Sequence, residues 1–403
     1  MTIRNDYSVY TGTRLIFGLL YTCVITLSVI SNSLIIYVIS TTHSLRSVRN
    51  LFVAGLALND IIVTLTSGIV TPLSIFQNEW KFGAVLCRAI ALIQGMSFFI
   101  SAYTLALIAV DRYILIVKAQ VVTPITFKQA AGLLAMVWTL AATSAALPVS
   151  RMRFRSLRPL CGRFCYEDWQ SLLTLRLVYG YASIVGTLVV PFGVTTFCYA
   201  MAGITIRKTI KFRRKRLGPA PAPSMVTEDC LSRSQPSYGS LVIAANGHQS
   251  DCTLKSTVEI QRANNEAELR RMANTNKLLV AVVVAFVLCW TPTYLFNFLK
   301  DINLFNIPHE YESVLQLSLH FIAMLTVVSN PILYGGFNRN VREAIVALVR
   351  KRLNTCPMRE NIGEVGCLHL KDQNDRNPIG GRNLGTIANT EVVDQHLLTD
   401  TKL

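Results

Sequence analysis

The chain alternates between long apolar stretches and short polar ones. Seven apolar stretches are long enough to cross a bilayer as helices, because about 20 residues at ~1.5 Å each span the ~30 Å hydrocarbon core. They lie at about 15–40, 51–76, 87–117, 126–148, 172–208, 273–299 and 313–334. The pattern therefore predicts an all-α membrane protein, a seven-transmembrane helix bundle.

Composition agrees with a membrane protein. The chain is 51% hydrophobic and only 15% charged, whereas a soluble protein of this size carries more charge. Its net charge of +16 comes from Lys and Arg that cluster beside the apolar stretches, without interleaved aromatic residues. We therefore expect contact with membrane lipids and none with nucleic acid.

The basic residues also orient the chain. RKTIKFRRKRLG follows the fifth stretch and ELRRMANTNK precedes the sixth, so the bias of Lys and Arg towards the inside places this loop in the cytosol. By parity we expect a multi-pass plasma-membrane protein with its N-terminus outside and its C-terminus in the cytosol. The loop before the fifth stretch departs from this bias, as a tolerated exception or as an attraction for anionic ligand or surface groups. Its arginines are Arg151, Arg153, Arg155, Arg158 and Arg163.

The sequence also predicts the two tails, the long cytosolic loop and a helix after the seventh span. Residues 1–13 form an extracellular tail, 14–336 the bundle, and 355–403 a disordered cytosolic tail. The cytosolic loop at about 212–268 lacks apolar periodicity and is expected to be disordered. Residues 337–354 place apolar side chains at helical spacing among Arg and Lys, which predicts an amphipathic eighth helix on the inner leaflet. Cys356, just after this helix, is predicted to be a palmitoylation site, with an ordinary free thiol as the alternative. The last three residues, Thr401-Lys402-Leu403, are typical of a C-terminal ligand for a PDZ protein.

Short motifs occur in a fixed order along the seven stretches. They are Asn32, LALND with Asp60, Cys87, DRY at 111–113, Trp138, Pro191 with Tyr199, CWTP at 289–292 and NPILY at 330–334. Together they resemble the rhodopsin-like (class A) G-protein-coupled receptors, over every span and the eighth helix. A second set resembles more closely the neuropeptide Y, neuropeptide F and RFamide-type receptors: Gln94, Asn297, Asp301, His320 and the CYEDW segment.

The resemblance implies a function and partners. We expect a receptor for an amidated neuropeptide that activates heterotrimeric G-proteins of the inhibitory class, with arrestin and a receptor kinase as further partners. A cofactor is not expected, apart from an allosteric sodium ion at Asp60, Ser101 and Asn330. A protonated Asp60 in a polar network is the alternative to that ion.

The resemblance also assigns residues to roles. It implies a disulfide between Cys87 and Cys165, with Cys161 as a rival partner. Gln94 stands where amine receptors carry an aspartate, so an amine ligand is disfavoured. The implied ligand-binding residues are Gln94, Asn297, Asp301, His320 and Trp290, with Asp301 suited to a ligand arginine. Those implied for activation and G-protein coupling are Asp111, Arg112, Tyr113, Tyr199, Phe286, Pro292, Asn330, Pro331 and Tyr334.

Met272 departs from the family pattern. Many members carry an acid at this position, which pairs with the DRY arginine at rest, so here the resting restraint on Arg112 is expected to come from Asp111 alone.

Other classes fit less well. A transporter would show internal repeats and paired mid-membrane charges, whereas Asp60 is the one clear mid-span acid. An enzyme would need a nucleophile with its base, or a metal motif such as H-E-x-x-H, and the sequence has neither. Within receptors, the alternative is an unrelated peptide or a lipid-like ligand in the same fold.

Overall fold

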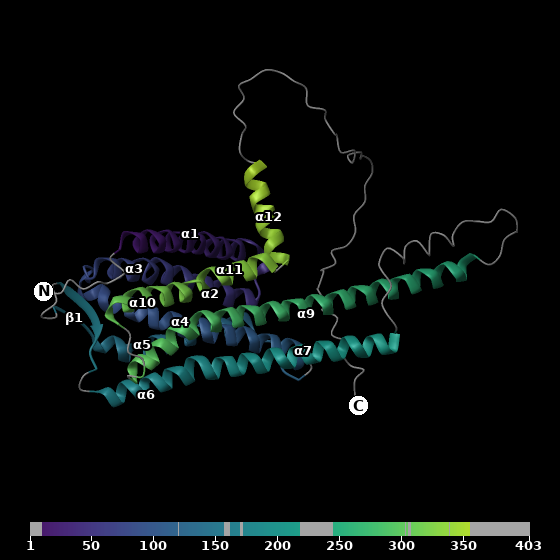
Figure 1. Cartoon of the computed structure of the whole chain (residues 1–403). Coiled ribbons are helices and arrows are strands. Elements are labelled where there is room, and N and C mark those ends of the chain that lie inside the picture. The colour runs from purple at the N-terminus through teal and green to yellow at the C-terminus, as the bar shows by residue number, and fades with distance from the viewer. Residues whose placement is uncertain are drawn as a thin grey trace, which may run out of the picture. The chain divides into compact units, whose positions relative to one another are not determined.

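The computed structural model describes residues 10–119, 121–156, 162–169, 172–217, 245–302, 304, 308–337 and 339–354. Within these ranges it omits the side chains of 216–217, 245–260, 309, 333–337, 339–340, 349 and 351–354. The chain divides into two units, Met1–Ala347 and Leu348–Leu403. The first unit holds a bundle of long helices (Figure 1).

Seven helical segments among the described residues are long and apolar enough to cross a membrane, which confirms the seven predicted spans. Each observed span lies within a few residues of its predicted range or extends beyond it. The helices are α1 (Thr11–Thr41), η2 (His43–Leu45), α2 (Val48–Leu65), α3 (Ser67–Gln77), α4 (Gly83–Val117), α5 (Phe127–Arg151), α6 (Leu173–Ile184), η3 (Val185–Val189), α7 (Val190–Leu217), α9 (Ala245–Asp301), α10 (His309–Met324), α11 (Thr326–Phe337) and α12 (Arg339–Asn354).

Side-chain caps define the starts of two spans. The Ser47 hydroxyl accepts a hydrogen bond from the Asn50 amide at the start of α2. Before α5, the Thr126 hydroxyl accepts from the Gln129 amide, and the Gln129 side chain accepts from the Thr126 amide at 2.9 Å. These bonds satisfy backbone N–H groups that have no partner inside the helix, and they fix where each helix begins.

Three spans are interrupted near a proline. The second span breaks at Thr66 between α2 and α3, and α3 contains Pro72. The fifth span has a π-helical turn, η3, just before Pro191 in α7, and the seventh breaks at Leu325 ahead of Pro331 in α11. Proline cannot donate its backbone hydrogen bond and crowds the preceding turn, so the helix deforms next to it.

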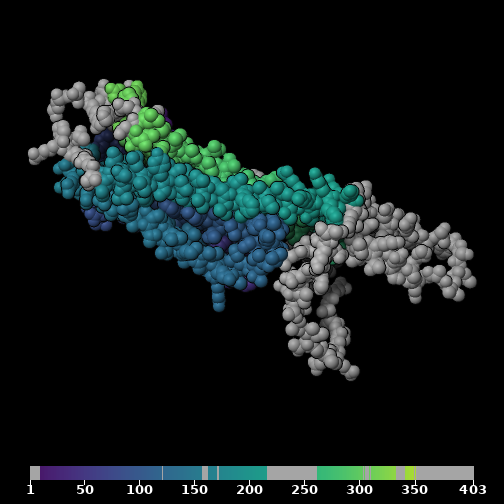
Figure 2. All heavy atoms as spheres, turned by 90° about the horizontal axis from the view of Figure 1, so that it is seen from below, coloured from purple at the N-terminus to yellow at the C-terminus, as the bar shows by residue number. Residues whose placement is uncertain are grey.

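The centre of the bundle is packed by side chains from α1, α2, α4, α7 and α9. Phe52, Leu105, Ile108 and Phe286 are each at most 1% exposed. α7 packs against α4 on one side and α9 on the other; Figure 2 shows the teal helix between the blue and green segments. Buried polar groups link helices that are distant in sequence, as where the Asn32 amide of α1 donates to the Val327 carbonyl of α11 at 2.8 Å.

A two-stranded antiparallel hairpin lies at one end of the bundle (Figure 1). Strand β1 (Met152–Ser156) pairs with β2 (Arg163–Glu167), with Phe154 opposite Cys165. We call this end the disulfide end, because Cys165 is bonded there to Cys87 of α4. The opposite end of α4 carries Asp111 and Arg112 and is called the arginine end.

The expectation of a disordered loop at 212–268 needs correction at both edges. α7 continues to Leu217 and α9 begins at Ala245, so helix covers part of that range. Glu266 explains part of the extension, since it pairs with Arg214 of α7 at 3.6 Å and with Arg270 one turn along α9 at 2.8 Å. Charged and polar residues fill most positions of these helix ends, so the apolar period that a pattern search looks for is missing. The predicted eighth helix is present as α12, which starts at Arg339.

Candidate functional site

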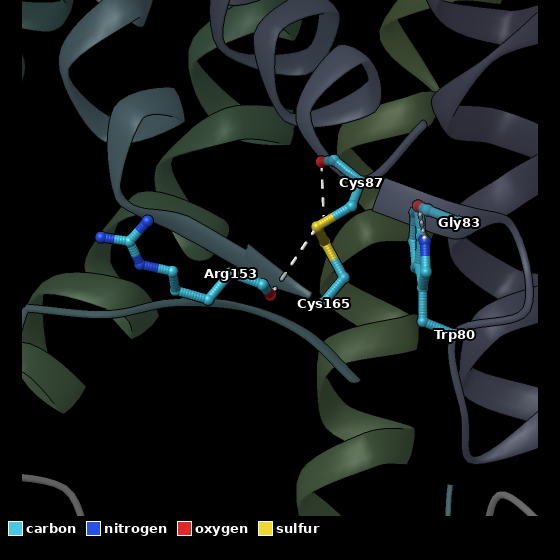
Figure 3. The surroundings of a disulfide bond; sticks show 5 residues. All are labelled: Trp80, Gly83, Cys87, Arg153 and Cys165. Carbon is cyan, nitrogen blue, oxygen red and sulfur yellow. Dashed lines mark hydrogen bonds between the residues drawn. A yellow bond between two sulfur atoms is a disulfide. The ribbon is translucent and has the colours of Figure 1, made fainter. Parts of the chain in front are cut away.

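The disulfide end is held by a covalent bond and two hydrogen bonds; Figure 3 shows the disulfide and the bond between Trp80 and Gly83. Cys87 in α4 is bonded to Cys165 in β2, as the resemblance implies. The rival partner, Cys161, lies outside the described residues. The Trp80 indole donates to the Gly83 carbonyl at 2.8 Å, and the Trp80 amide donates to the Arg163 carbonyl at 2.7 Å. The hairpin is therefore fixed to the start of α4.

An aromatic cluster lies between α4 and α9. Phe98 of α4 is 1% exposed, and its ring centroid is 4.9 Å from Trp290, 5.4 Å from Phe286 and 4.4 Å from Tyr294. Pro292 lies two residues after Trp290 in α9 and lacks a backbone N–H. The rings therefore pack beside a turn that lacks one backbone hydrogen bond. The Trp290 indole N–H is buried without a hydrogen-bond partner in the described part of the chain. It is a donor that a ligand or a water could use.

His320 lies in a buried chain of hydrogen bonds. The Tyr21 hydroxyl donates to the Leu317 carbonyl at 3.1 Å and lies 2.8 Å from Nδ1 of His320. Because its single proton is used, the hydroxyl accepts from Nδ1–H, and Nε2 accepts from the Ser67 hydroxyl at 3.1 Å. Both ring nitrogens are thus engaged within the protein. His320 joins α1, α3 and α10, and offers no spare hydrogen bond to a ligand in this arrangement.

The remaining predicted ligand residues have different surroundings. Gln94 is half-buried on α4 and Asn297 is exposed on α9. Neither side chain forms a hydrogen bond within the described residues. Asp301, at the end of α9, forms an ion pair with Arg176 of α6. The adjacent Lys300 pairs with Glu312 of α10. The structure therefore gives Asp301 a cationic partner within the same chain.

Asp60 and Asn330 meet in the middle of the bundle. The Asn330 side-chain amide donates to Asp60 Oδ2 at 3.0 Å, and both residues are at most 4% exposed. The Ser101 hydroxyl accepts instead from the Asn59 amide, at 3.1 Å. The structure thus brings two of the three predicted sodium ligands together and places the third beside Asn59.

At the arginine end, Arg112 is held loosely. Its Nε lies 3.7 Å from Asp111 Oδ2, which is within ion-pair range but too long for a hydrogen bond. Arg49 of α2 is a second cation whose charge acts on Asp111. Arg49 was not expected here, because the sequence shows the adjacent pair Asp111-Arg112 but not which residue of α2 lies near it.

The other coupling residues lie in α4, α7 and α11. The Tyr113 ring packs on Phe197 of α7, and the Asn276 side chain of α9 donates to the Tyr199 carbonyl at 3.2 Å. Pro331 is a buried residue of α11. Tyr334 belongs to α11, but its side chain is outside the described set, as is the whole of Cys356. The PDZ-type segment 401–403 also lies outside the described residues.

Besides Arg49, three residues that contact predicted ligand-binding residues were not expected from the sequence. Phe98 is one apolar residue in an apolar helix, and Tyr21 looks like any aromatic residue in the first span. Arg176 carried the clearest signal, since it is a charge near the start of the fifth apolar stretch and at the same end as Asp301. Charged side chains near span ends commonly find partners, and a search for pairs across neighbouring spans could have found it.

Three comparisons with known proteins agree with these features. Residues 31–334 match the family model described as "7 transmembrane receptor (rhodopsin family)". The chain is 30% identical to Neuropeptide receptor 3 of Caenorhabditis elegans, over 87% of this chain and 83% of the relative. It is 28% identical to the human neuropeptide Y receptor type 2, over 84% and 77% respectively. The crystal structure of squid rhodopsin superposes with a TM-score of 0.61 at 20% identity, covering 84% of this chain and 86% of that one.

Proposed function

Because the chain belongs to the rhodopsin family of seven-transmembrane receptors, we propose that it is a cell-surface receptor for an amidated neuropeptide of the neuropeptide Y, neuropeptide F or RFamide kind. The observation that carries the proposal is the similarity to receptors named for neuropeptides, which extends over more than four fifths of the chain. The family consists of signalling receptors and not of enzymes. The peptide would act by shifting an equilibrium that the receptor already samples.

The proposed orientation places the disulfide end outside the cell and the arginine end in the cytosol, in the plasma membrane. The basic segments after the fifth span and before the sixth support it. The peptide would then enter from the hairpin side, and a G-protein of the inhibitory class would bind beside Arg112. Arrestin and a receptor kinase would act at that cytosolic face.

The polar side chains proposed for ligand binding support a peptide with a basic residue and a neutral, amidated C-terminus. Gln94, two helical turns below Cys87, offers an amide where an amine ligand would need a carboxylate. Asn297 is exposed and offers a second amide, suited to a peptide C-terminal amide. Asp301 would receive a ligand arginine, in competition with Arg176. His320 would shape the wall of the site through Tyr21 and Ser67.

Activation would use the aromatic cluster and the arginine end. A ligand that presses on Trp290 would move Phe98 and Phe286 with it, because the three rings are in contact. Movement of α9 around Pro292 would change its contact with α7, where Asn276 bonds to the Tyr199 backbone. Arg112 would then leave Asp111 and meet Tyr199, Tyr334 and the G-protein.

A sodium ion at Asp60, Ser101 and Asn330 is a further part of the proposal. The donor set fits a monovalent cation, because it has one buried carboxylate and neutral oxygens. No group of three His, Cys, Asp or Glu side chains that could hold a divalent ion occurs among the described residues. Asp60 and the side chains of Asn330 and Ser101 would hold the ion. It would supply positive charge that stabilises the resting arrangement.

The proposal is tested by screening synthetic amidated peptides against the receptor expressed in cells, with G-protein activation as the readout. Activation by Arg-Phe-amide or Arg-Tyr-amide peptides, lost when the same peptides carry a free carboxylate, would support it. Activation by unrelated peptides or by lipid extracts alone would assign the chain to the alternative ligand classes. Peptide-independent uptake of a solute would identify a transporter.

A further inference from the structure

A cavity lined by arginines lies beside the disulfide. Its volume is about 160 Å³, and it is formed by the start of α4 and by β1. Figure 3 shows that the Arg153 carbonyl faces the disulfide while its guanidinium extends away from it. The lining residues are Ala84, Cys87, Arg88, Met152, Arg153, Phe154 and Arg155.

The lining residues include three arginines and no acidic residue. Arg88 and Arg155 are exposed and form no ion pair within the part of the chain that the structure describes. Arg153 pairs with Asp168, at an N–O distance of 4.0 Å that is the upper limit for such a pair. Positive charge at the cavity is therefore largely uncompensated by the protein, which favours an anionic ligand.

The neighbouring strand does not neutralise this charge. In the hairpin register, Arg153 lies opposite Tyr166 and Arg155 opposite Phe164. Arg153 and Arg155 are two residues apart, so they share one face of the strand, and Tyr166 and Phe164 share that face across the ladder. The residues opposite Arg153 and Arg155 are therefore aromatic and uncharged.

The cavity is also fixed in position. The Cys87–Cys165 disulfide ties the hairpin to α4, and the Trp80 amide donates to the Arg163 carbonyl. Arg163, at the far end of the hairpin, lies over the Phe154 ring at 5.6 Å and does not line the cavity. The backbone that carries these arginines is therefore held in place, which lowers the entropy lost when they bind a carboxylate.

The position of the cavity fits one part of a peptide ligand. Gln94 lies seven residues below Cys87 on α4, which is ~10 Å along the helix axis. An extended peptide covers that distance in about three residues. A peptide whose amidated end reaches Gln94 would bring a residue upstream of that end to the level of Arg88 and Arg155.

On the basis of the proposed receptor function, we propose that this cavity binds the carboxylate of an acidic side chain located upstream of the amidated end of the peptide ligand. A volume of about 160 Å³ suits one such side chain and not a chain of sulfated sugars. The arginine forks would hold the carboxylate by bidentate hydrogen bonds. The site would thereby select acidic members among peptides that share the same terminal residues.

The test uses pools of synthetic octapeptides ending in Arg-Phe-amide or Arg-Tyr-amide. In each pool one upstream position is Glu, and the matched pool has Gln there. We expect wild-type receptor in cells to respond to Glu at one such position at about 10-fold lower concentration than to Gln. Arg88→Gln and Arg155→Gln should each reduce that ratio strongly, while Arg163→Gln, the matched hairpin control, should preserve it.

The ratio is measured within each variant, so it is independent of how much receptor reaches the surface. Equal potency of Glu and Gln pools on the wild type, or a ratio that survives in both cavity variants, would overturn the inference while the receptor function stands. Equal losses for Glu and Gln pools in the cavity variants would indicate a structural role and also overturn it. If no pool activates the wild type, the proposed ligand class fails and the inference fails with it.

Discussion

Arg176 on α6 forms an ion pair with Asp301 at the end of α9. The preceding residue, Lys300, pairs with Glu312 on α10, so two neighbouring residues of opposite charge link α9 to two different helices. The first pair occupies the carboxylate that we propose for a ligand arginine. A peptide that reaches Asp301 must therefore displace Arg176 or share the carboxylate with it.

Removing this internal competitor should favour an arginine-containing peptide. For Arg176→Gln we expect potency to rise by up to about fivefold, because the pair is partly solvated and such pairs contribute ~0.2–1 kcal/mol. The measurement is a concentration–response curve with an Arg-Phe-amide peptide and with its citrulline analogue. The analogue should show no gain, and Lys300→Gln serves as a control in the neighbouring pair. A gain of equal size for both peptides would show that Arg176 does not compete for Asp301.

Removing the carboxylate should have the opposite effect. Asp301→Ala is expected to weaken the arginine peptide by ~2–5 kcal/mol, about 30-fold or more, since a partly dehydrated arginine–carboxylate pair is lost. The citrulline peptide should lose far less. The background Arg176→Gln, with and without Asp301→Ala, separates the ligand contact from the loss of the internal pair. Equal losses for both peptides in this cycle would mean that Asp301 does not recognise the arginine.

Arg112 is the residue whose loss should separate binding from signalling. Arg112→Ala is expected to abolish G-protein activation and to leave peptide affinity within about threefold, because Arg112 lies at the end of α4 far from Cys87. Radiolabelled peptide binding and G-protein activation are measured on the same membranes. Full signalling by a well-expressed variant would refute the role given to Arg112.

Met272 allows the resting restraint to be strengthened. Arg112 lies 3.7 Å from Asp111 without a hydrogen bond, and Met272 supplies no charge from α9. Met272→Glu should add a partner from α9 and lower ligand-independent signalling. The readout is basal G-protein activity at equal surface expression, with Met272→Gln as an uncharged control. Unchanged basal activity in the Glu variant would contradict the prediction.

The sequence predicts those features that depend on local pattern. Apolar length predicts the seven spans, and the resemblance of CYEDW to the family pattern implies Cys165, with Cys161 as its rival, as the partner of Cys87. The pairing of Asp301 with Arg176 is not visible in the same way, because it depends on which helix ends are neighbours in space. The helical ends of the 212–268 loop were missed for a different reason, since their mostly charged and polar residues leave no apolar period. The contact of Phe98 with Trp290 and Phe286 likewise requires the packing of α4 on α9.

His320 shows how a contact network changes the interpretation of a residue. The family resemblance made it a candidate for direct ligand contact, but both ring nitrogens are engaged by Tyr21 and Ser67. Tyr21→Phe removes the hydroxyl and leaves Nδ1–H of a 6%-exposed ring without an acceptor. An unsatisfied buried donor costs ~1–3 kcal/mol, so the ligand-free receptor should unfold at a lower temperature.

His320→Gln should destabilise the ligand-free receptor at least as much as Tyr21→Phe, because it disturbs both bonds and the stacking on Tyr21. Thermal unfolding of purified ligand-free receptor measures this, and peptide concentration–response curves are taken in parallel. A network role predicts that the effects of Tyr21→Phe and His320→Gln are not additive. The double variant should lose less stability than the sum of the losses in the two single variants, since each single change already breaks the same bond. A ligand contact predicts another pattern. Peptide potency would then fall in His320→Gln and stay unchanged in Tyr21→Phe, with the stability of the ligand-free receptor close to wild type in both. That result would return His320 to the residues that touch the peptide.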